Sequence, residues 1–246
     1  MDSEVDIAIC LRQWDYSETS QTAALLCKRL GVVRVLGKGT KRADPRFSGG
    51  LEIATIGEAV IVPKSNSGLS TLAGWDLRST CRGARADLQC YYAAMFALEV
   101  AINLLPEGEP HPDSFHALES LLESISPVNW QQQVATYLWS VLKDAGFAPR
   151  IEPDLEDNVV FIPALGQLTS PTEEHRQETA WEVLGSTAAA MSVLAETGAA
   201  VTLSAEDAER VGRLLAWYVR EVIERELSTL RPLFGDLHPR TSPPRG

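Results

Sequence analysis

The spacing of hydrophobic residues changes near Arg78, and this change constrains the fold more than any other feature of the chain. Before it, large apolar side chains alternate with smaller or polar ones, so that Val5, Ile7, Ile9 and Leu11 share one face. A period of two is typical of a strand with one buried face. After Arg78, apolar residues recur every third or fourth position, which is typical of helices. The sequence therefore predicts a β-rich N-terminal part and a helical C-terminal part.

The β-rich part consists of short extended runs separated by turn residues. We expect strands over residues 5–12, 19–27, 31–36, 51–56, 59–63 and 69–77. Short strands without a long helix suit a small closed barrel, of which the OB-fold is a common example. We therefore predict an OB-fold over residues 1–80.

The helical part contains several apolar stripes. The first comprises Leu88, Tyr91, Met95, Leu98, Ile102 and Leu105, and it ends at Pro106. Further stripes run from about Asp113 to Ile125 and from Val134 to Gly146, and Ser204 with Asp207 can cap a last long helix. Residues 148–167 are predicted as an extended or looped connection. The predicted fold class is α+β: an N-terminal OB-fold β-barrel, an all-helical domain over 81–234, and a flexible tail over 235–246.

Composition excludes several classes of protein. The chain has 246 residues, of which 45% are hydrophobic and 22% charged, so it can bury a core without a cofactor or metal. No run approaches the roughly 20 apolar residues of a membrane span. Three of the first six residues are acidic and none is basic, whereas a signal peptide begins with basic residues. We expect a cytoplasmic protein without a cofactor and without membrane contact.

No set of residues has the spacing that catalysis or metal binding requires. The four cysteines lie far apart or within apolar runs, and the closest histidines, His111 and His116, are five positions apart. No nucleophile elbow occurs. Gly37-Lys38-Gly39-Thr40 resembles half of a phosphate-binding loop, but the first glycine of that motif is missing. We expect no catalytic residue, no metal and no enzymatic activity.

The charge is distributed unevenly along the chain. The net charge is −11, yet the segment from Lys28 to Arg46 contains seven basic residues and one acidic residue, Asp44. This segment therefore carries +6 and the rest of the chain −17. Such cations can follow a sugar-phosphate backbone, with Phe47, Trp14 or Tyr16 available to stack on bases. The same loop could also be an ordinary solvated surface, or could bind an acidic protein partner as part of an interaction adaptor.

Several motifs in this order resemble those of the RecO family. The first is the turn Tyr16-Ser17-Glu18. The most specific are Lys38-Gly39-Thr40-Lys41-Arg42 and then Arg46-Phe47-Ser48-Gly49-Gly50-Leu51-Glu52. Weaker similarity continues through the segment from Pro106 to Pro110 and through Gly146-Phe147-Ala148-Pro149. Many family members carry paired Cys-x-x-Cys motifs after the last segment, whereas residues 150–167 contain no cysteine, so zinc is not expected.

The resemblance implies a function in DNA repair and homologous recombination. A RecO-like protein would bind single- and double-stranded DNA and anneal complementary strands. Its partners would be RecR and the C-terminal tail of the single-stranded-DNA-binding protein, so that RecA can load indirectly through the RecF pathway. The expected contacts with DNA phosphates are Lys38, Lys41, Arg42 and Arg46, together with Arg29 and Arg34.

Overall fold

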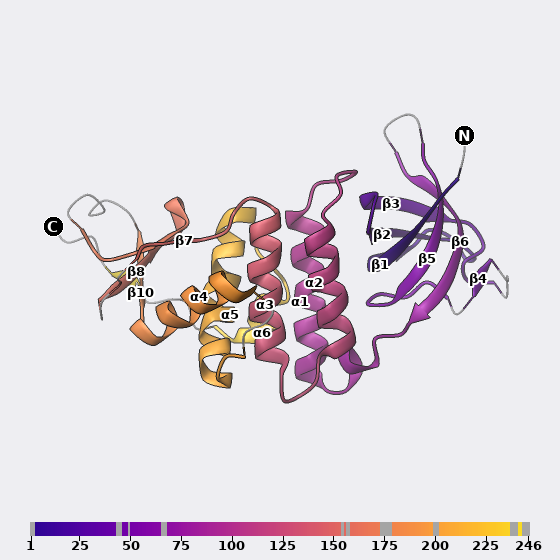
Figure 1. The fold of residues 1–246 in the computed structure, drawn as a ribbon. Helices are drawn as coiled ribbons and strands as arrows, with labels where there is room; N and C mark the ends of the chain where they lie inside the picture. Colours follow the sequence, from indigo (N-terminus) through magenta and orange to yellow (C-terminus); the bar gives the residue numbers. More distant parts are fainter. Residues whose placement is uncertain are drawn as a thin grey trace. The chain divides into compact units, whose positions relative to one another are not determined.

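The structure is a computed structural model that describes residues 3–42, 46–48, 50–64, 68–153, 155, 158–172, 179–198, 202–236 and 241–242. The chain divides into two compact units, residues 1–127 and 128–246. Strands β1 to β6, the short helix η1 and helices α1 and α2 belong to unit 1, and the remaining elements belong to unit 2 (Figure 1).

Unit 1 contains a closed five-stranded barrel. Its strands are β1 (Glu4–Asp15), β2 (Gln21–Cys27), β3 (Gly31–Gly37), β5 (Ile56–Val62) and β6 (Ser70–Ser79), and the short β4 (Phe47–Ser48) lies beside β6. The strands β1 to β3 and the pairs β1–β5 and β5–β6 are antiparallel, and a parallel pairing of β3 with β6 closes the barrel. An OB-like barrel followed by a helical region confirms the predicted α+β class.

The barrel strands bury side chains on both faces over part of their length. Ala23, Leu25 and Val35 point into the barrel core, together with Trp75 and Leu72. The neighbouring residues point outward because side chains alternate along a strand. The outward row formed by Ile9, Leu26 and Val32 is also buried, and helix α1 packs against β1 and β2.

The prediction of a strand over residues 51–56 is wrong. Only Ile56 is extended, as the first residue of β5, and one strand replaces the two that were expected. Ala54 has a left-handed backbone, with φ of 57°, which ends any extended run. Its N–H donates to Cys10 O, and Cys10 N–H donates to Thr55 O, both at 2.9 Å. These bonds hold residues 54 and 55 against an irregular point of β1.

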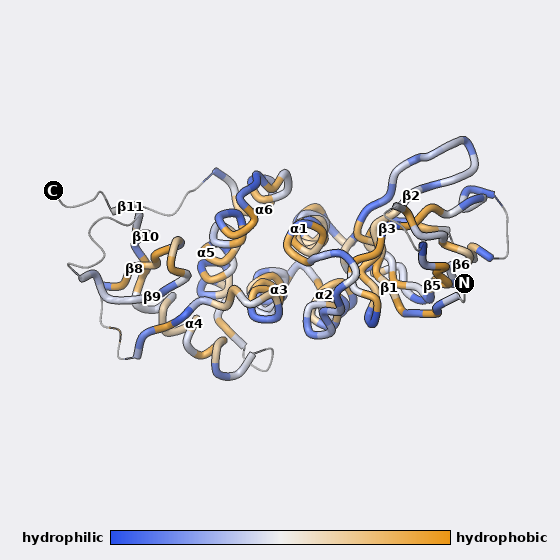
Figure 2. Tube along the Cα trace, turned by 90° about the horizontal axis from the view of Figure 1, so that it is seen from above, coloured by the Kyte–Doolittle hydropathy of each residue, from blue (hydrophilic) through white to orange (hydrophobic). Residues whose placement is uncertain are grey.

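The predicted helices are present with nearly the expected bounds. Unit 1 contains η1 (Arg82–Arg85), α1 (Leu88–Leu104) and α2 (Pro112–Ser124), and unit 2 contains α3 (Trp130–Asp144), α4 (Gly185–Thr197), α5 (Ala205–Ile223) and α6 (Leu230–Phe234). Ser204 Oγ accepts the Asp207 N–H at 3.1 Å, so it caps α5 as expected. Figure 2 shows hydrophilic and hydrophobic residues alternating along α3 and α5, as helices with one buried face require.

The C-terminal part is not all-helical. Unit 2 contains a sheet of β7 (Arg150–Ile151), β8 (Val159–Ile162), β9 (Gln167–Thr169), β10 (Ala180–Val183) and β11 (Thr241–Ser242), with η2 (Pro163–Leu165) after β8. The strands have two to four residues each, too few to show a clear period in the sequence. The described part of the expected tail includes β11, which pairs with β10.

The loop between α1 and α2 attaches to strand β3. Gly108 N–H donates to Val32 O at 2.9 Å, and Glu107 forms a parallel bridge with Val32. Gly31 has a φ of +69°, and a Cβ atom there would lie 2.0 Å from Glu109 O. Only glycine permits this close approach of two backbones. The barrel and the pair α1–α2 are therefore joined along β3 within unit 1.

Candidate nucleic-acid interface

The basic loop, residues 38–42, follows β3 directly and is held in a tight turn. The Arg42 N–H donates to Gly39 O at 3.0 Å, and Gly39 has a φ of +83°. Lys38 and Arg42 are exposed, and neither forms an ion pair with a carboxylate that the structure describes. Asp44, the one acid of the predicted basic segment, lies outside the described residues. The turn thus displays two cations to solvent.

Lys41 connects the basic loop to the hairpin of β1 and β2. Its Nζ lies 2.6 Å from Asp15 Oδ1, and its backbone N–H donates to Thr19 O at 3.3 Å. The Asp15 side chain is largely exposed, so water screens this ion pair. A phosphate group could replace the carboxylate at modest cost in free energy.

Arg46 is exposed, and its Cζ lies 5.9 Å from the centre of the Phe47 ring. Phe47 itself is 5% exposed and belongs to the barrel core, so the suggestion that it stacks on bases is wrong. Trp14 and Tyr16 remain available, at 37% and 63% exposure. Of the three proposed aromatic residues, these two can reach a ligand.

Arg29 and Arg34 lie apart from the basic loop. Arg29 precedes β3, Arg34 lies within β3, and Lys38 follows its end. Seven strand residues span roughly 20 Å. Arg29 Nε lies 3.5 Å from Asp6 Oδ1, and the buried Asp6 carboxylate also accepts the Arg29 and Leu30 N–H groups at 2.8 and 3.1 Å. Arg29 therefore helps to hold the β2–β3 turn.

Arg34 occupies the outer face of β3, where it pairs with Glu107 of the loop between α1 and α2. Both side chains are about half exposed. Of the six predicted cations, Lys38, Lys41, Arg42 and Arg46 thus lie in or after the basic loop, whereas Arg29 lies before β3 and Arg34 lies within it.

Arg12 is a candidate that the sequence reasoning missed. It lies opposite Ala24, which lies opposite Arg34, so Arg12 and Arg34 share the outer face two strands apart. The Arg12 Cζ lies 5.2 Å from the centre of the Trp14 ring, a cation–π contact. Alternation alone would place Arg12 on the same face as Cys10, which lies in the barrel core, but the register shift between Cys10 and Arg12 turns Arg12 to the outer face.

The described residues supply no obvious metal site. Among them, no group of three or more His, Cys, Asp and Glu side chains could hold an ion. All four cysteines are buried, and burial raises the pKa of the Cys10 thiol to about 12 and that of Cys90 to about 11. Such thiols remain protonated at neutral pH and are poor ligands and nucleophiles. No helix in the described parts of the chain is both long and apolar enough to cross a membrane.

Comparisons with known proteins agree with this geometry. The family model "Recombination protein O N terminal" matches residues 1–81, and "Recombination protein O C terminal" matches residues 85–231. The DNA repair protein RecO of Geobacter metallireducens is 37% identical over 126 residues, which is 51% of this chain and 50% of that protein. The proteins of the same name from Rhodopirellula baltica and Bacillus subtilis are 30% and 31% identical over 132 and 121 residues.

The alignment with the Rhodopirellula protein covers 54% of this chain and 48% of the relative, and that with the Bacillus protein covers 49% and 46%. The chain thus spans about half the length of the curated relatives it matches. The family models together match most of the chain. The chain therefore belongs to the recombination protein O family, RecO.

Proposed function

We propose that this protein is a non-catalytic mediator of DNA repair and homologous recombination that binds single- and double-stranded DNA and anneals complementary strands. The observation that carries the proposal is the exposed basic loop, with Lys38, Lys41 and Arg42 in one turn of an otherwise acidic chain. Relatives in the family carry the name DNA repair protein RecO. Such a mediator would work in the cytoplasm, at the nucleoid.

The expected recognition is electrostatic and independent of base sequence. Lysine and arginine that neutralise phosphates release condensed counterions, so the affinity falls as salt rises. Contacts from Arg29, Arg34, Lys38, Lys41, Arg42 and Arg46 would amount to six phosphates. For single strands, the slope of log K against log salt would then be near −4, since each phosphate contributes about −0.7.

The test is fluorescence anisotropy of a labelled single strand and of a duplex across a salt series. We expect Lys41→Glu with Arg42→Glu to weaken binding of both DNAs and to make the single-strand slope shallower by about 1.4. The matched control is Lys143→Glu with Arg150→Glu, which changes the charge of two exposed cations of unit 2 by the same amount. A slope that the first pair leaves unaltered would exclude the basic loop from the interface.

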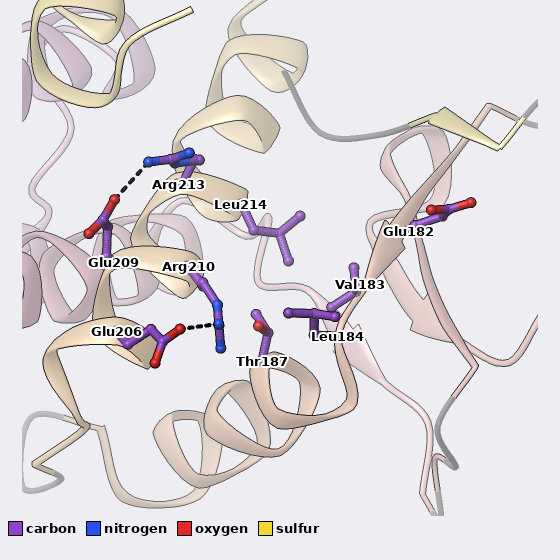
Figure 3. A pocket seen from close by; sticks show the side chains of 9 residues that line it. All are labelled: Glu182, Val183, Leu184, Thr187, Glu206, Glu209, Arg210, Arg213 and Leu214. Atoms are coloured by element: carbon purple, nitrogen blue, oxygen red, sulfur yellow. Dashed lines mark hydrogen bonds and ion pairs between the residues drawn. The ribbon is translucent and has the colours of Figure 1, made fainter. Parts of the chain in front are cut away.

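A cavity of about 420 Å³ in unit 2 is the proposed contact for a protein partner (Figure 3). Val183, Leu184 and Leu214 supply its apolar lining, and Arg210 extends from α5 toward Thr187. The lining also includes Glu182, Glu206 and Glu209, and Glu206 pairs with Arg210. A short acidic and apolar tail would place its side chains on the apolar lining and a carboxylate against Arg210 in place of Glu206. We propose that the tail of the single-stranded-DNA-binding protein docks here and that RecR completes the assembly that assists RecA loading.

The partner contact is tested with a labelled peptide of that tail. Arg210→Glu should abolish binding, whereas Arg231→Glu should not, although both arginines are ion-paired and belong to unit 2. Equal binding by both variants would exclude this cavity.

The second candidate function is a protein-interaction adaptor whose basic loop binds an acidic protein partner. The net charge of −11 favours it, because an acidic body repels DNA. The adaptor function predicts that the chain binds neither the single strand nor the duplex, even in dilute buffer. It also predicts that the chain binds an acidic peptide through Lys41 and Arg42. The salt series therefore separates the two functions directly.

A further inference from the structure

A small cavity lies on the outer face of the barrel, about 230 Å³ in volume. Its lining comprises Trp14 of β1, Thr22 and Ala23 of β2, Arg34 of β3 and Leu69, which precedes β6. The residues come from four segments that the barrel pairing brings together, since β3 pairs with both β2 and β6. The cavity is therefore built by the fold itself.

The lining combines apolar surface, an aromatic ring and positive charge. Trp14 lies opposite Thr22 across the β1–β2 pairing, and Arg12 packs on the Trp14 ring. Leu69 adds a large apolar side chain that is 36% exposed. Arg34 contributes a planar guanidinium group with several donors. A flat, partly apolar ligand with hydrogen-bond acceptors matches this combination.

The basic loop lies beside the cavity. Asp15, which pairs with Lys41, directly follows Trp14 in β1. Leu36 pairs with Thr22 and precedes the loop by two residues. A strand whose phosphates contact Lys38, Lys41 and Arg42 would thus pass close to Trp14.

We propose that this cavity receives one unpaired base of a bound DNA strand, which stacks on Trp14 and accepts a hydrogen bond from Arg34. The proposal rests on the proposed DNA-binding function and deepens it. Its volume is below the ~300–1,000 Å³ of pockets that enclose a drug-sized ligand, so one ring system is the largest occupant. Base–aromatic stacking tolerates any sequence because every base has a π-face.

The consequence is discrimination between single strands and duplexes. Bases in a duplex are paired and stacked, and extruding one costs a few kcal/mol. The basic loop contacts phosphates, which both forms of DNA possess. The loop would therefore bind both forms, and the cavity would add affinity for single strands only.

The experiment compares three labelled probes of equal length: a single strand, its duplex, and a single strand of abasic sugar-phosphate units. Trp14→Ala should bind the single strand about five- to tenfold more weakly, the lower range for the loss of one stacked base. Duplex and abasic binding should stay the same. Trp14→Phe should restore part of the lost affinity, because phenylalanine retains a ring.

Tyr91→Ala is the matched control, since Tyr91 is an exposed aromatic residue of α1 in the same unit. It should leave all three affinities unchanged. Thermal unfolding of each variant checks that the barrel is intact.

Each outcome has one meaning. If Trp14→Ala binds the single strand as the wild type does, or loses duplex and single-strand binding equally, the base pocket is overturned. DNA binding through the basic loop would survive the first result. If the wild type binds none of the probes, the proposed function fails and the base pocket with it.

Discussion

The two units place their cations in different surroundings. On α5 of unit 2, Arg213 lies 2.7 Å from Glu209 one turn earlier, and Arg210 pairs in the same way with Glu206. In the basic loop of unit 1, Lys38 and Arg42 pair with no carboxylate within the described part of the chain. Arginines of α5 are thus neutralised by glutamates one turn away, whereas Lys38 and Arg42 of the basic loop are exposed and Lys41 beside them pairs with Asp15.

The difference follows from backbone geometry. A helix brings residues four apart onto one face, so a glutamate one turn away is held close to an arginine. A turn with glycine provides no such neighbour. Residues 1–127 carry 12 basic and 16 acidic residues, for a net charge of −4, and residues 128–246 carry 10 and 17, for −7. Both units carry a net negative charge, and that of unit 1 is the smaller.

The comparison is sharpened most strongly by chemical labelling of thiols, because all four cysteines lie in unit 1 and none in unit 2. Burial raises the pKa of Cys10 from 9.0 to about 12, so at pH 8 its reactive thiolate is about a thousandfold scarcer than in the unfolded chain. We expect native thiols to react with a disulfide reagent at least about a hundredfold more slowly than in urea. Raising the pH from 7 to 9 should accelerate thiol labelling of the unfolded chain far more than that of the native chain.

Equal labelling rates in the native and unfolded chains would contradict the burial of these thiols in an ordered unit 1. The emission of Trp139 and Trp217, both buried in unit 2, provides the parallel probe of that unit.

Gly31→Ala tests whether the two units lose stability separately. A Cβ atom would clash with Glu109 O and require a left-handed backbone, so we expect unit 1 to lose about 3 kcal/mol. Urea unfolding followed by thiol exposure measures this change. Gly108→Ala is the control, because its φ of +74° is similar but no atom lies within 4 Å, and about 1–2 kcal/mol is expected. Equal losses in both variants would contradict the close backbone contact.

Asp15→Asn tests the one carboxylate among the described residues that pairs with a cation of the basic loop. Removing it frees Lys41 for phosphate, so the dissociation constant for a single strand should fall by up to about fivefold, the range for an exposed ion pair. Anisotropy at low salt measures the change. Glu18→Gln removes the same charge from the same exposed hairpin and should have a smaller effect. If the two variants bind DNA equally, only net charge matters and the Lys41–Asp15 pair does not.

Glu206→Gln with Glu209→Gln removes the glutamate partners of Arg210 and Arg213 in unit 2, while Asp207 stays 3.8 Å from Arg210. We expect the smallest effect here. The unit retains a net negative charge, so DNA affinity should change by less than about twofold. The same titration measures it. An increase in DNA affinity as large as that of Asp15→Asn would contradict the difference between the two units. Arginines of either unit would then bind DNA equally well.

The sequence was informative wherever the determining pattern is local. The stripe from Leu88 to Leu105 and the Ser204 cap predicted α1 and the start of α5, since both depend on neighbours within one turn. The basic loop was predicted from charge and glycine spacing alone. The structure places Lys38, Lys41 and Arg42 together in it.

The sequence was uninformative where a residue depends on a distant partner. Arg34 pairs with Glu107, which is 73 positions away, and no local sequence pattern indicates that contact. Phe47 lies in a glycine-rich polar loop, yet its ring packs against the core because β4 pairs with β6 at Trp75. The short strands of unit 2 depend on partners such as β11, which is about 60 residues beyond β10.

The attachment of residues 107–109 to β3 also limits how the molecule can be divided. A fragment that ends after β6 would expose Ile9, Leu26 and Val32 to water and lose the backbone bond to Val32. Exposed apolar surface of this kind promotes aggregation. The barrel alone is therefore not expected to be a stable fragment. A truncated protein that contains the barrel should end after Pro127, so that helices α1 and α2 remain attached.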